Sequence, residues 1–237
     1  MKIGAQLYTL REFTTTASGF EDSLKRVSAM GYEGVQLSAV GCMNGPKPEV
    51  SAQQAKEMLD AFCLTAAATH RGWDAFASDL ANEIEFHQTM GCTYTAIGWL
   101  PNEFERTDEG FRRWLQLAVP VASKLKEQGI RFGYHNHDFE FVRTGPNRRT
   151  AYDVFLEEGA PDLELEIDTY WVQSGGFDPA SLLRRAAGRI WAVHLKDWEI
   201  IVGEGHEMAP VGEGSLDWRG IIDACRTGGT EWLLVEQ

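Results

Sequence analysis

Basic residues are scarce in this sequence relative to acidic ones. The 237-residue chain has 22 lysines and arginines against 35 aspartates and glutamates, which gives a formal charge of −13. Proteins that bind the phosphate backbone of a nucleic acid normally present a basic stripe to it. We therefore expect no nucleic-acid partner for this chain.

Long apolar runs and closely spaced cysteines are also missing. No stretch approaches the roughly 18 uninterrupted apolar residues of a membrane helix, and the first residues form no apolar signal segment. The four cysteines, Cys42, Cys63, Cys92 and Cys225, lie far apart and include no CxxC pair. Reduced thiols that fill the core are therefore favoured over disulfides or a zinc knuckle. We expect a cytoplasmic protein without a membrane partner.

Short apolar runs alternate regularly with longer amphipathic stretches along the chain. Strands are predicted at Lys2–Tyr8, Tyr32–Leu37, Leu64–Thr69, Tyr94–Gly98, Arg131–His135, Leu163–Ile167, Ile190–Leu195 and Trp232–Glu236. Helices are predicted near Phe20–Met30, Ala52–Phe62, Ala75–Met90, Asp108–Gln128, Ala151–Glu158, Pro179–Ala187 and Trp218–Thr227. Strands separated by helices of this length indicate right-handed βαβ units and a parallel sheet.

Eight strands with helices between them are the pattern of an α/β fold, the (β/α)8 TIM barrel. A doubly wound sheet is the competing fold, but it would more often carry a glycine-rich loop after the first strand. This chain has Tyr8-Thr9-Leu10-Arg11-Glu12 there instead. Because no linker or low-complexity segment interrupts the pattern, we expect a single domain over residues 1–237.

The predicted barrel lacks a final helix, because the sequence stops at the eighth strand. The outer faces of the first and last strands would then expose apolar residues such as Leu233 and Val235. We therefore expect either a homo-oligomer, in which a partner subunit covers this seam, or a longer native chain.

Functional groups of a TIM barrel collect at the carboxyl ends of its strands. The polar and aromatic residues at those ends are Gln36, His70, Trp99, His135, His137, Asp138, Glu140, Asp168, Trp171, His194, Lys196, Asp197 and Glu236. The two remaining histidines, His87 and His206, are expected at the surface. The long loop 198–217 follows the seventh strand, and we expect it to act as a lid.

Strand parity brings three of these residues together, since alternate side chains of a barrel strand face its interior. The predicted inward residues of the last three strands are Glu164, Glu166, Asp168, Ala192, His194, Lys196, Leu234 and Glu236. Asp168, His194 and Glu236 therefore converge at the barrel mouth. Carboxylates so close repel one another unless a cation neutralises them, which predicts a bound divalent metal. Lower in the barrel, Arg131 is expected to pair with Glu164 or Glu166.

The fourth ligand should come from the end of the fifth strand, where His135, His137 and Glu140 compete. A shell of three carboxylates and one histidine favours Mn²⁺ or Mg²⁺, with Co²⁺ or Zn²⁺ as alternatives. A shell with two histidines favours Zn²⁺ or Fe²⁺.

Several segments resemble the xylose isomerase-like TIM barrel superfamily, in its sugar phosphate isomerase/epimerase branch. The matching segments are GAQLYTLR, GYEGVQLS, GYHNHDFEF, LEIDTYWVQSGG, RIWAVHLKD, PVGEGSLDW and LLVEQ. The resemblance implies a divalent metal held by Glu140, Asp168, His194 and Glu236. It also implies substrate contacts from His70, His137 and Lys196. The chain departs from many relatives at Gln36, where they carry a glutamate, and in lacking an eighth helix.

These residues predict a metal-dependent isomerase or epimerase that acts on a small carbohydrate, a keto sugar or its phosphate, through an enediolate. Glu140 and Glu236 would exchange the proton as base and acid, and Lys196 would hold the developing oxyanion. His135 and the rings of Trp99 and Trp171 would form further substrate contacts.

Three other functions compete with this prediction. The same proton abstraction could start a lyase or dehydratase reaction on a keto sugar or a 3-keto glycoside. Cleavage of abasic DNA would need more histidines and a basic groove. A non-catalytic sugar-binding barrel would need a broken ligand set.

Overall fold

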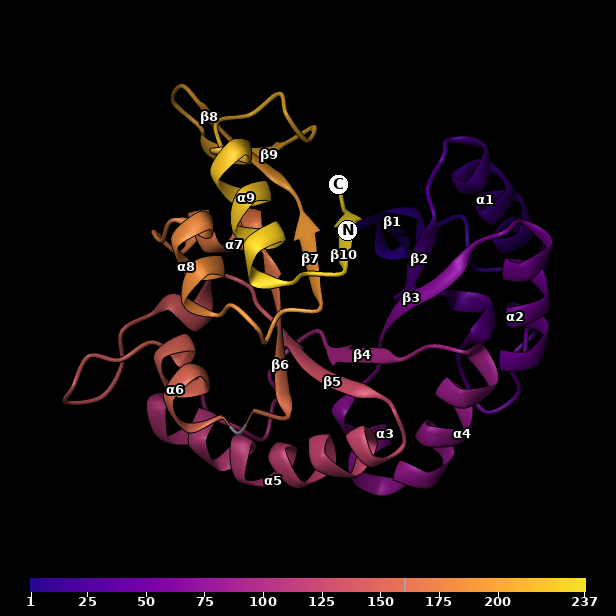
Figure 1. The fold of residues 1–237 in the computed structure, drawn as a ribbon, viewed down its shortest axis with the longest axis horizontal. Coiled ribbons are helices and arrows are strands. Elements are labelled where there is room, and N and C mark those ends of the chain that lie inside the picture. The colour runs from indigo at the N-terminus through magenta and orange to yellow at the C-terminus, as the bar shows by residue number, and fades with distance from the viewer. Residues whose placement is uncertain (160) are drawn as a thin grey trace.

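The computed structural model describes residues 1–159 and 161–237, and its centre is a closed barrel of parallel strands (Figure 1). The strands follow one another around the barrel in the order β1-β10-β7-β6-β5-β4-β3-β2. Their bounds are Lys2–Gln6 (β1), Gly34–Leu37 (β2), Thr65–His70 (β3), Tyr94–Ile97 (β4), Arg131–His135 (β5), Leu163–Asp168 (β6), Ala192–Leu195 (β7) and Trp232–Val235 (β10). The predicted TIM barrel is confirmed, and the strands differ from the predicted ones by a few residues at their ends.

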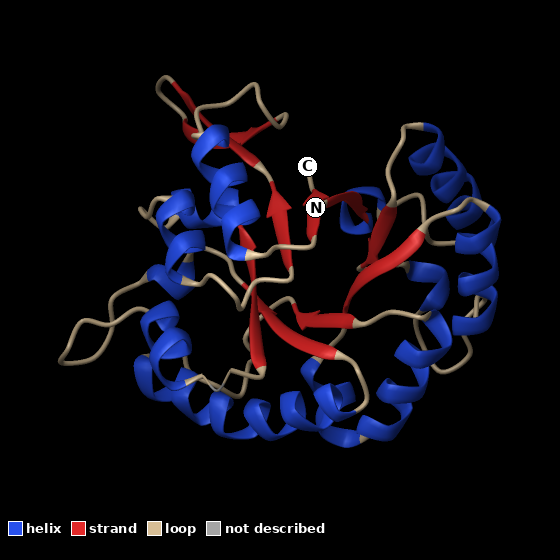
Figure 2. Cartoon of the chain, viewed as in Figure 1, coloured by secondary structure: helices blue, strands red, loops and turns tan. Residues whose placement is uncertain are grey.

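Helices surround the strands on the outside, as Figure 2 shows. The α-helices are α1 (Ala17–Ala29), α2 (Ala52–Ala61), α3 (Trp73–Ser78), α4 (Leu80–Met90), α5 (Asp108–Glu127), α6 (Ala151–Glu158), α7 (Thr169–Ser174), α8 (Pro179–Arg185) and α9 (Trp218–Gly228). Short 3₁₀ turns are η1 (Leu7–Leu10), η2 (Gly41–Met43) and η3 (Phe139–Phe141). Within the described residues, no helix has the length and apolar character needed to cross a bilayer.

The helix ends follow from local chemistry. A capping box starts α2, in which the Ser51 hydroxyl accepts from the Gln54 N–H and the Gln54 side chain accepts from the Ser51 N–H. Gly91 ends α4 with φ 64° and Gly229 ends α9 with φ 82°. This left-handed conformation suits glycine, which has no Cβ to clash, and it turns the chain towards the next strand.

The barrel interior confirms the predicted strand parity. Leu163, Leu165 and Ile167 of β6 pack outwards against the helices, and Glu166 and Asp168 are buried on the other face. The amino-terminal part of the interior is filled by Ala67, Ala68, Tyr94, Ala96, Ala192, Trp232 and Leu234. Glycine makes room for Tyr94, since a Cβ at Gly133 would lie 2.2 Å from the Tyr94 hydroxyl oxygen.

Two predicted helical regions need correction. The helix expected over Ala75–Met90 is two helices, α3 and α4, which meet at Asp79, whose backbone is not helical (φ −148°, ψ 72°). The Asp79 carboxylate accepts a hydrogen bond from the Asn82 N–H and thereby starts α4 anew. The short helix α7 was not predicted, because its single turn directly follows β6 and has no periodic pattern of its own.

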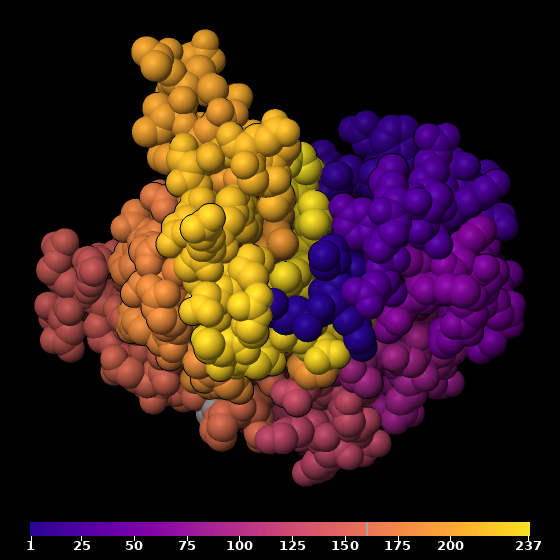
Figure 3. Space-filling view, turned by 45° about the horizontal axis from the view of Figure 1, so that its top comes forward, coloured from indigo at the N-terminus to yellow at the C-terminus, as the bar shows by residue number. Residues whose placement is uncertain are grey.

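The expected lid loop is mostly a β-hairpin. The strands β8 (Asp197–Ile201) and β9 (Gly205–Ala209) pair antiparallel, and they project from the barrel at the upper left of Figure 3. Val202 at the tip is 95% exposed. The signal that could have predicted the hairpin is the glycine-containing turn of residues 202–204, in which Gly203 has φ 86°.

The structure also corrects three statements about single residues. Leu233 is only 5% exposed, because it packs in the outer core, whereas Val235 is partly buried beside a cavity of about 460 Å³ between β1 and α1. His87 is fully buried rather than at the surface, and its ring nitrogens contact Thr69 and the Glu83 carbonyl. Cys63 is exposed, unlike the other three cysteines.

Candidate active site

A cleft of about 660 Å³ opens at the carboxyl ends of the barrel strands. The predicted site residues among those that line it are His70, Trp99, His135, His137, Trp171, Lys196 and Glu236. They come from six different strands or the segments that follow them. The fold thus gathers all the predicted substrate-contacting side chains in one cavity, together with Met208 of the hairpin.

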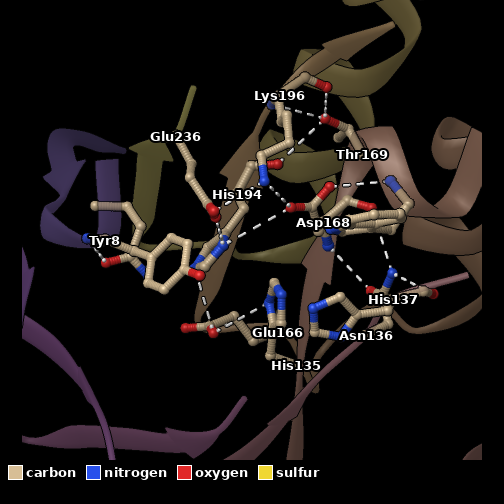
Figure 4. A network of polar contacts seen from close by, with 12 residues as sticks. Tyr8, His135, Asn136, His137, Glu166, Asp168, Thr169, His194, Lys196 and Glu236 are labelled. Carbon is tan, nitrogen blue, oxygen red and sulfur yellow. Dashed lines mark hydrogen bonds and ion pairs between the residues drawn. The ribbon is translucent and has the colours of Figure 1, made fainter. Parts of the chain in front are cut away.

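Asp168, His194 and Glu236 form a compact group, in which Glu236 lines the cleft and Asp168 and His194 are fully buried beside it. One ligand atom from each lies within 4.8 Å of the others, and Figure 4 shows their side chains turned towards one another. His194 Nδ1 is 2.8 Å from Glu236 Oε2 and 3.9 Å from Asp168 Oδ2. The Lys196 ammonium donates to Glu236 Oε1 at 2.8 Å and lies 3.7 Å from Asp168 Oδ2. Lys196 therefore forms its ion pair with Glu236.

The pKa shifts and hydrogen bonds of this group are compatible with a bound cation. Burial raises the pKa of Asp168 to about 6, and the charge of Glu236 adds to the effect. Burial opposes ionisation of Glu236 as well, but hydrogen bonds and charge from His194 and Lys196 outweigh it and hold the pKa of Glu236 well below its ordinary value. Asp168 Oδ2 is buried and has no hydrogen-bond partner among the described residues. A buried carboxylate oxygen without a hydrogen bond, next to an imidazole and a second carboxylate, could hold a divalent metal.

Neighbouring groups hold Asp168 and Lys196 in place. The Asp168 N–H donates to Asn136 Oδ1 at 3.0 Å, and the hydroxyl of Tyr152 donates to the same oxygen at 2.8 Å. The Thr169 hydroxyl donates to the Lys196 carbonyl at 2.8 Å and accepts from the Lys196 N–H at 3.0 Å. These bonds tie the ends of β5, β6 and β7 together, so the site is organised before any ligand binds.

A second polar group lies beside the first and was only partly anticipated. His70, His135, Glu166 and His194 also offer ligand atoms within 4.8 Å of one another. Glu166 is fully buried and contacts the rings of His70 and His194. Gln36 donates from Nε2 to Glu166 Oε1 at 2.8 Å. Parity had placed Glu166 inward, two residues before Asp168, but nothing in the sequence showed that histidines surround it.

Glu140 lies apart from both groups. It belongs to η3, is fully buried and is not among the residues that line the cleft. The Tyr134 hydroxyl donates to Glu140 Oε1 at 2.6 Å, and the His137 N–H donates to Oε2 at 2.8 Å. Burial nevertheless raises the pKa of Glu140 to about 8. Its predicted role as a metal ligand stays a prediction, and His135 is the residue of β5 that faces the other histidines.

Aromatic rings form one wall of the cleft. The His137 ring centroid lies 4.7 Å from that of Trp99 and 5.2 Å from that of Trp171. Burial and the nearby charge of Lys196 lower the pKa of His137 to about 4, so its ring is neutral at neutral pH. The Arg106 guanidinium lies over Trp99, 4.4 Å from the ring centroid. Aromatic faces next to polar side chains are typical of a wall that binds a carbohydrate ring.

The closed parallel barrel, with carboxylates and histidines at the carboxyl ends of its strands, places the chain among the TIM-barrel proteins whose residues could hold a metal ion at that end. Comparison with known families names the particular one: the model of the xylose isomerase-like TIM barrel matches residues 24–237. The chain belongs to this family, as its motifs predicted.

Several known proteins are similar to this chain. A sugar phosphate isomerase/epimerase from Parabacteroides distasonis ATCC 8503 has the same fold, with a TM-score of 0.79 and 21% identity over 100% of this chain and 90% of that one. A zinc-bound IOLI protein has a TM-score of 0.72 and 16% identity over 100% of this chain and 88% of that one. Inosose dehydratase from Lacticaseibacillus casei is 26% identical over 151 residues, which are 57% of this chain and 47% of the relative. The match thus spans about half the length of that curated relative.

Proposed function

We propose that this chain is a divalent-metal-dependent isomerase or epimerase of an uncharged keto sugar. The observation that carries the proposal is the group of Asp168, His194 and Glu236, which meets a cleft with an aromatic wall at Glu236. The isomerase/epimerase from Parabacteroides distasonis shares the whole fold, which supports this class of reaction by analogy.

Asp168, His194 and Glu236 would hold the metal, with Mn²⁺ or Mg²⁺ favoured by two carboxylates and Co²⁺ or Zn²⁺ as alternatives. When bound, the metal polarises a substrate carbonyl and acidifies the neighbouring C–H group. The Glu236 carboxylate lines the cleft and would accept that proton. The Lys196 ammonium would balance the negative charge that develops on the substrate oxygen.

Glu140 is proposed as the partner that returns the proton. A carboxyl group with a pKa of about 8 holds its proton at neutral pH, which is the state that a general acid needs. Because Glu140 is buried and does not line the cleft, this role requires η3 to turn its carboxyl group towards the bound substrate. Glu140→Gln should therefore lower turnover while leaving the count of bound metal ions unchanged. A lost ion would instead assign Glu140 to the metal.

The charges of the cleft favour a substrate without phosphate. Among the described residues that line it, the cationic side chains are Arg71 and Lys196. Arg71 is bound by both carboxylate oxygens of Glu83, at 2.8 and 2.6 Å, and Lys196 is bound by Glu236. A phosphate group would have to displace one of these pairs, whereas a neutral sugar leaves both in place.

A lyase or dehydratase is the second candidate, because the curated relatives that match part of the chain are named inosose dehydratase. The experiment that separates the two incubates ketoses and 3-keto glycosides with the Mn²⁺-loaded protein in D₂O and follows them by NMR. The isomerase incorporates deuterium at the α-carbon and interconverts sugars. The lyase releases water or an aglycone and produces an enone.

Glu236→Gln should stop either reaction, and Glu207→Gln on the exposed strand β9 is the matched control. Enone without an isomer would assign the lyase. No exchange across the panel would favour a sugar-binding barrel that lacks catalysis.

A further inference from the structure

The second polar group contains more ligand atoms than the proposed reaction uses. Its members are His70 at the end of β3, His135 at the end of β5, Glu166 in β6 and His194 in β7. Three of the four are buried, and the side chain of His70 is 14% exposed where it borders the cleft. Four strands therefore direct three imidazoles and one carboxylate to a single point inside the barrel.

The geometry separates this point from the first group. His194 Nδ1 lies 2.8 Å from Glu236 Oε2, whereas His194 Nε2 lies 2.6 Å from Gln36 Oε1 and 3.3 Å from Glu166 Oε2. Figure 4 shows the ring of His194 between Glu236 above and Glu166 below. His70, His135 and Glu166 thus lie on the opposite side of the His194 ring from Glu236.

The three imidazoles are close enough to share a ligand. The ring centroids are 5.1 Å apart for His70 and His135, 4.5 Å for His135 and His194, and 5.5 Å for His70 and His194. His135 Nδ1 is buried, has no hydrogen-bond partner among the described residues and lies 3.5 Å from Glu166 Oε2. Because this buried ring nitrogen makes no hydrogen bond, it is available to bind a ligand beside the carboxylate.

Hydrogen bonds from neighbouring residues fix the orientation of the Glu166 carboxylate. Gln36 donates to Oε1, which leaves Oε2 facing His70, His135 and His194. Gln36 is held in turn by Gln6 Nε2, which donates to Gln36 Oε1 at 2.9 Å. Fixing one carboxylate oxygen while the other faces imidazoles is the usual arrangement around a protein-bound metal.

We propose that His70, His135 and Glu166 form a second metal site, for Zn²⁺ or a similar divalent transition metal. Two histidines and one carboxylate with a fourth position open are the ligand set of catalytic zinc sites. The ion enters through the cleft, which His70 and His135 both line. This inference is independent of the proposed reaction, because ions can be counted whatever the substrate is.

The test counts metal ions in the intact chain after dialysis against Zn²⁺, and records the visible d–d absorption after Co²⁺ is substituted. The wild type should bind two ions per chain. His70→Gln and Glu166→Gln should each bind one and lose the intense absorption of four-coordinate Co²⁺. Asp168→Asn should also bind one ion but keep that absorption. His206→Gln, on the exposed hairpin, is the histidine control and should keep both ions.

Three results would overturn the second site. One is a wild type with a single ion that His70→Gln and Glu166→Gln retain. Another is a single ion lost in both sets of variants, which would mean one shared position. The third is a chain without any bound ion, which would also remove the metal from the proposed function. Melting temperatures of all variants exclude unfolding as the cause, and the wild-type count decides the matter if a variant fails to fold.

Discussion

The two ends of the barrel interior are built from the same strands but differ in chemistry. At the amino-terminal end, Ala192 and Leu234 close the barrel with apolar contacts. Two residues further along the same strands, His194 and Glu236 are buried polar groups with several charged neighbours. Burial of charge costs free energy unless each charge is paired. The apolar end therefore supplies stability, and the polar end uses part of it to hold groups that can bind a cation.

Strand β6 carries this contrast within one element. Glu164 lies near the amino-terminal end and pairs with Arg131, whose side chain is 49% exposed. The predicted ion pair low in the barrel is thereby confirmed, with Glu164 as the acid. Asp168, four residues later, is fully buried and has an oxygen without a hydrogen bond among the described residues. The two acids of this strand therefore differ in how far the protein satisfies their oxygens.

The largest effect on stability is expected at the apolar end. Trp232 fills the interior between β10 and β2, and its ring lies where a Cβ on Gly34 would be 2.8 Å away. Trp232→Ala should lower the free energy of unfolding by about 4 kcal/mol, because it leaves a cavity in the core. The number of bound metal ions should not change. Urea denaturation measures the effect, and the partly buried Trp191→Ala is the control with a smaller loss. Equal losses in both variants would contradict this account of the interior.

A smaller effect is expected at the base of the hairpin. The buried Asp197 carboxylate accepts hydrogen bonds from Trp218 Nε1 at 2.6 Å and from the N–H groups of Trp198 and Gly212 at 2.8 Å. Asp197→Asn should cost about 2 kcal/mol at neutral pH. Asp223→Asn, on the exposed face of α9, is the matched control and should stay within about 0.5 kcal/mol of the wild type.

The loss of unfolding free energy in Asp197→Asn should become smaller as the pH falls. Burial alone would raise the pKa of Asp197, but the hydrogen bonds from Trp218, Trp198 and the loop outweigh it and hold the pKa below the ordinary 3.8. A depressed pKa stabilises the fold above the unfolded value, and the stabilisation is lost as pH falls through the folded pKa. The difference between wild type and variant should therefore be full at neutral pH and shrink below about pH 4. A difference that grows in acid would contradict this explanation.

The smallest effect is expected at the ion pair of Arg131 and Glu164. Because Arg131 is half exposed, water screens the pair, and Glu164→Gln should change the free energy of unfolding by less than about 1 kcal/mol. Turnover should stay at the wild-type level. A loss of turnover comparable to that of Asp168→Asn would show that the two ends of β6 are not separate in function.

The fold could be predicted from the sequence because its signals are local. Apolar strands, helix caps and glycines such as Gly91 recur along the chain, and each can be recognised within about ten residues. The hairpin β8–β9 and the break at Asp79 were missed because short elements carry few periodic positions. His87 was misplaced because its burial depends on Thr69, which is distant in sequence.

Part of the site could be predicted by the same local rule. Parity alone brought Asp168, His194 and Glu236 together, since each strand has a definite inner face. The partners of Glu140 and Glu166 could not be found in this way. Their positions depend on the stagger between β5 and β6, where His135 pairs in register with Glu166, and on how η3 turns Glu140 towards Tyr134. Such contacts are three-dimensional and leave no pattern in a single sequence.

We propose that the polar end of the barrel binds a divalent cation through Asp168. The most direct test compares metal content and melting with and without EDTA for wild type, Asp168→Asn and Glu164→Gln. A metal ion whose free concentration is about 100 times its dissociation constant stabilises the folded protein by about 2.7 kcal/mol. Wild type and Glu164→Gln should bind equal numbers of ions and show equal stabilisation. Asp168→Asn should bind one ion fewer and lose the stabilisation that this ion contributes. Equal metal content and equal melting shifts in all three proteins, or no bound ion in any of them, would contradict the claim.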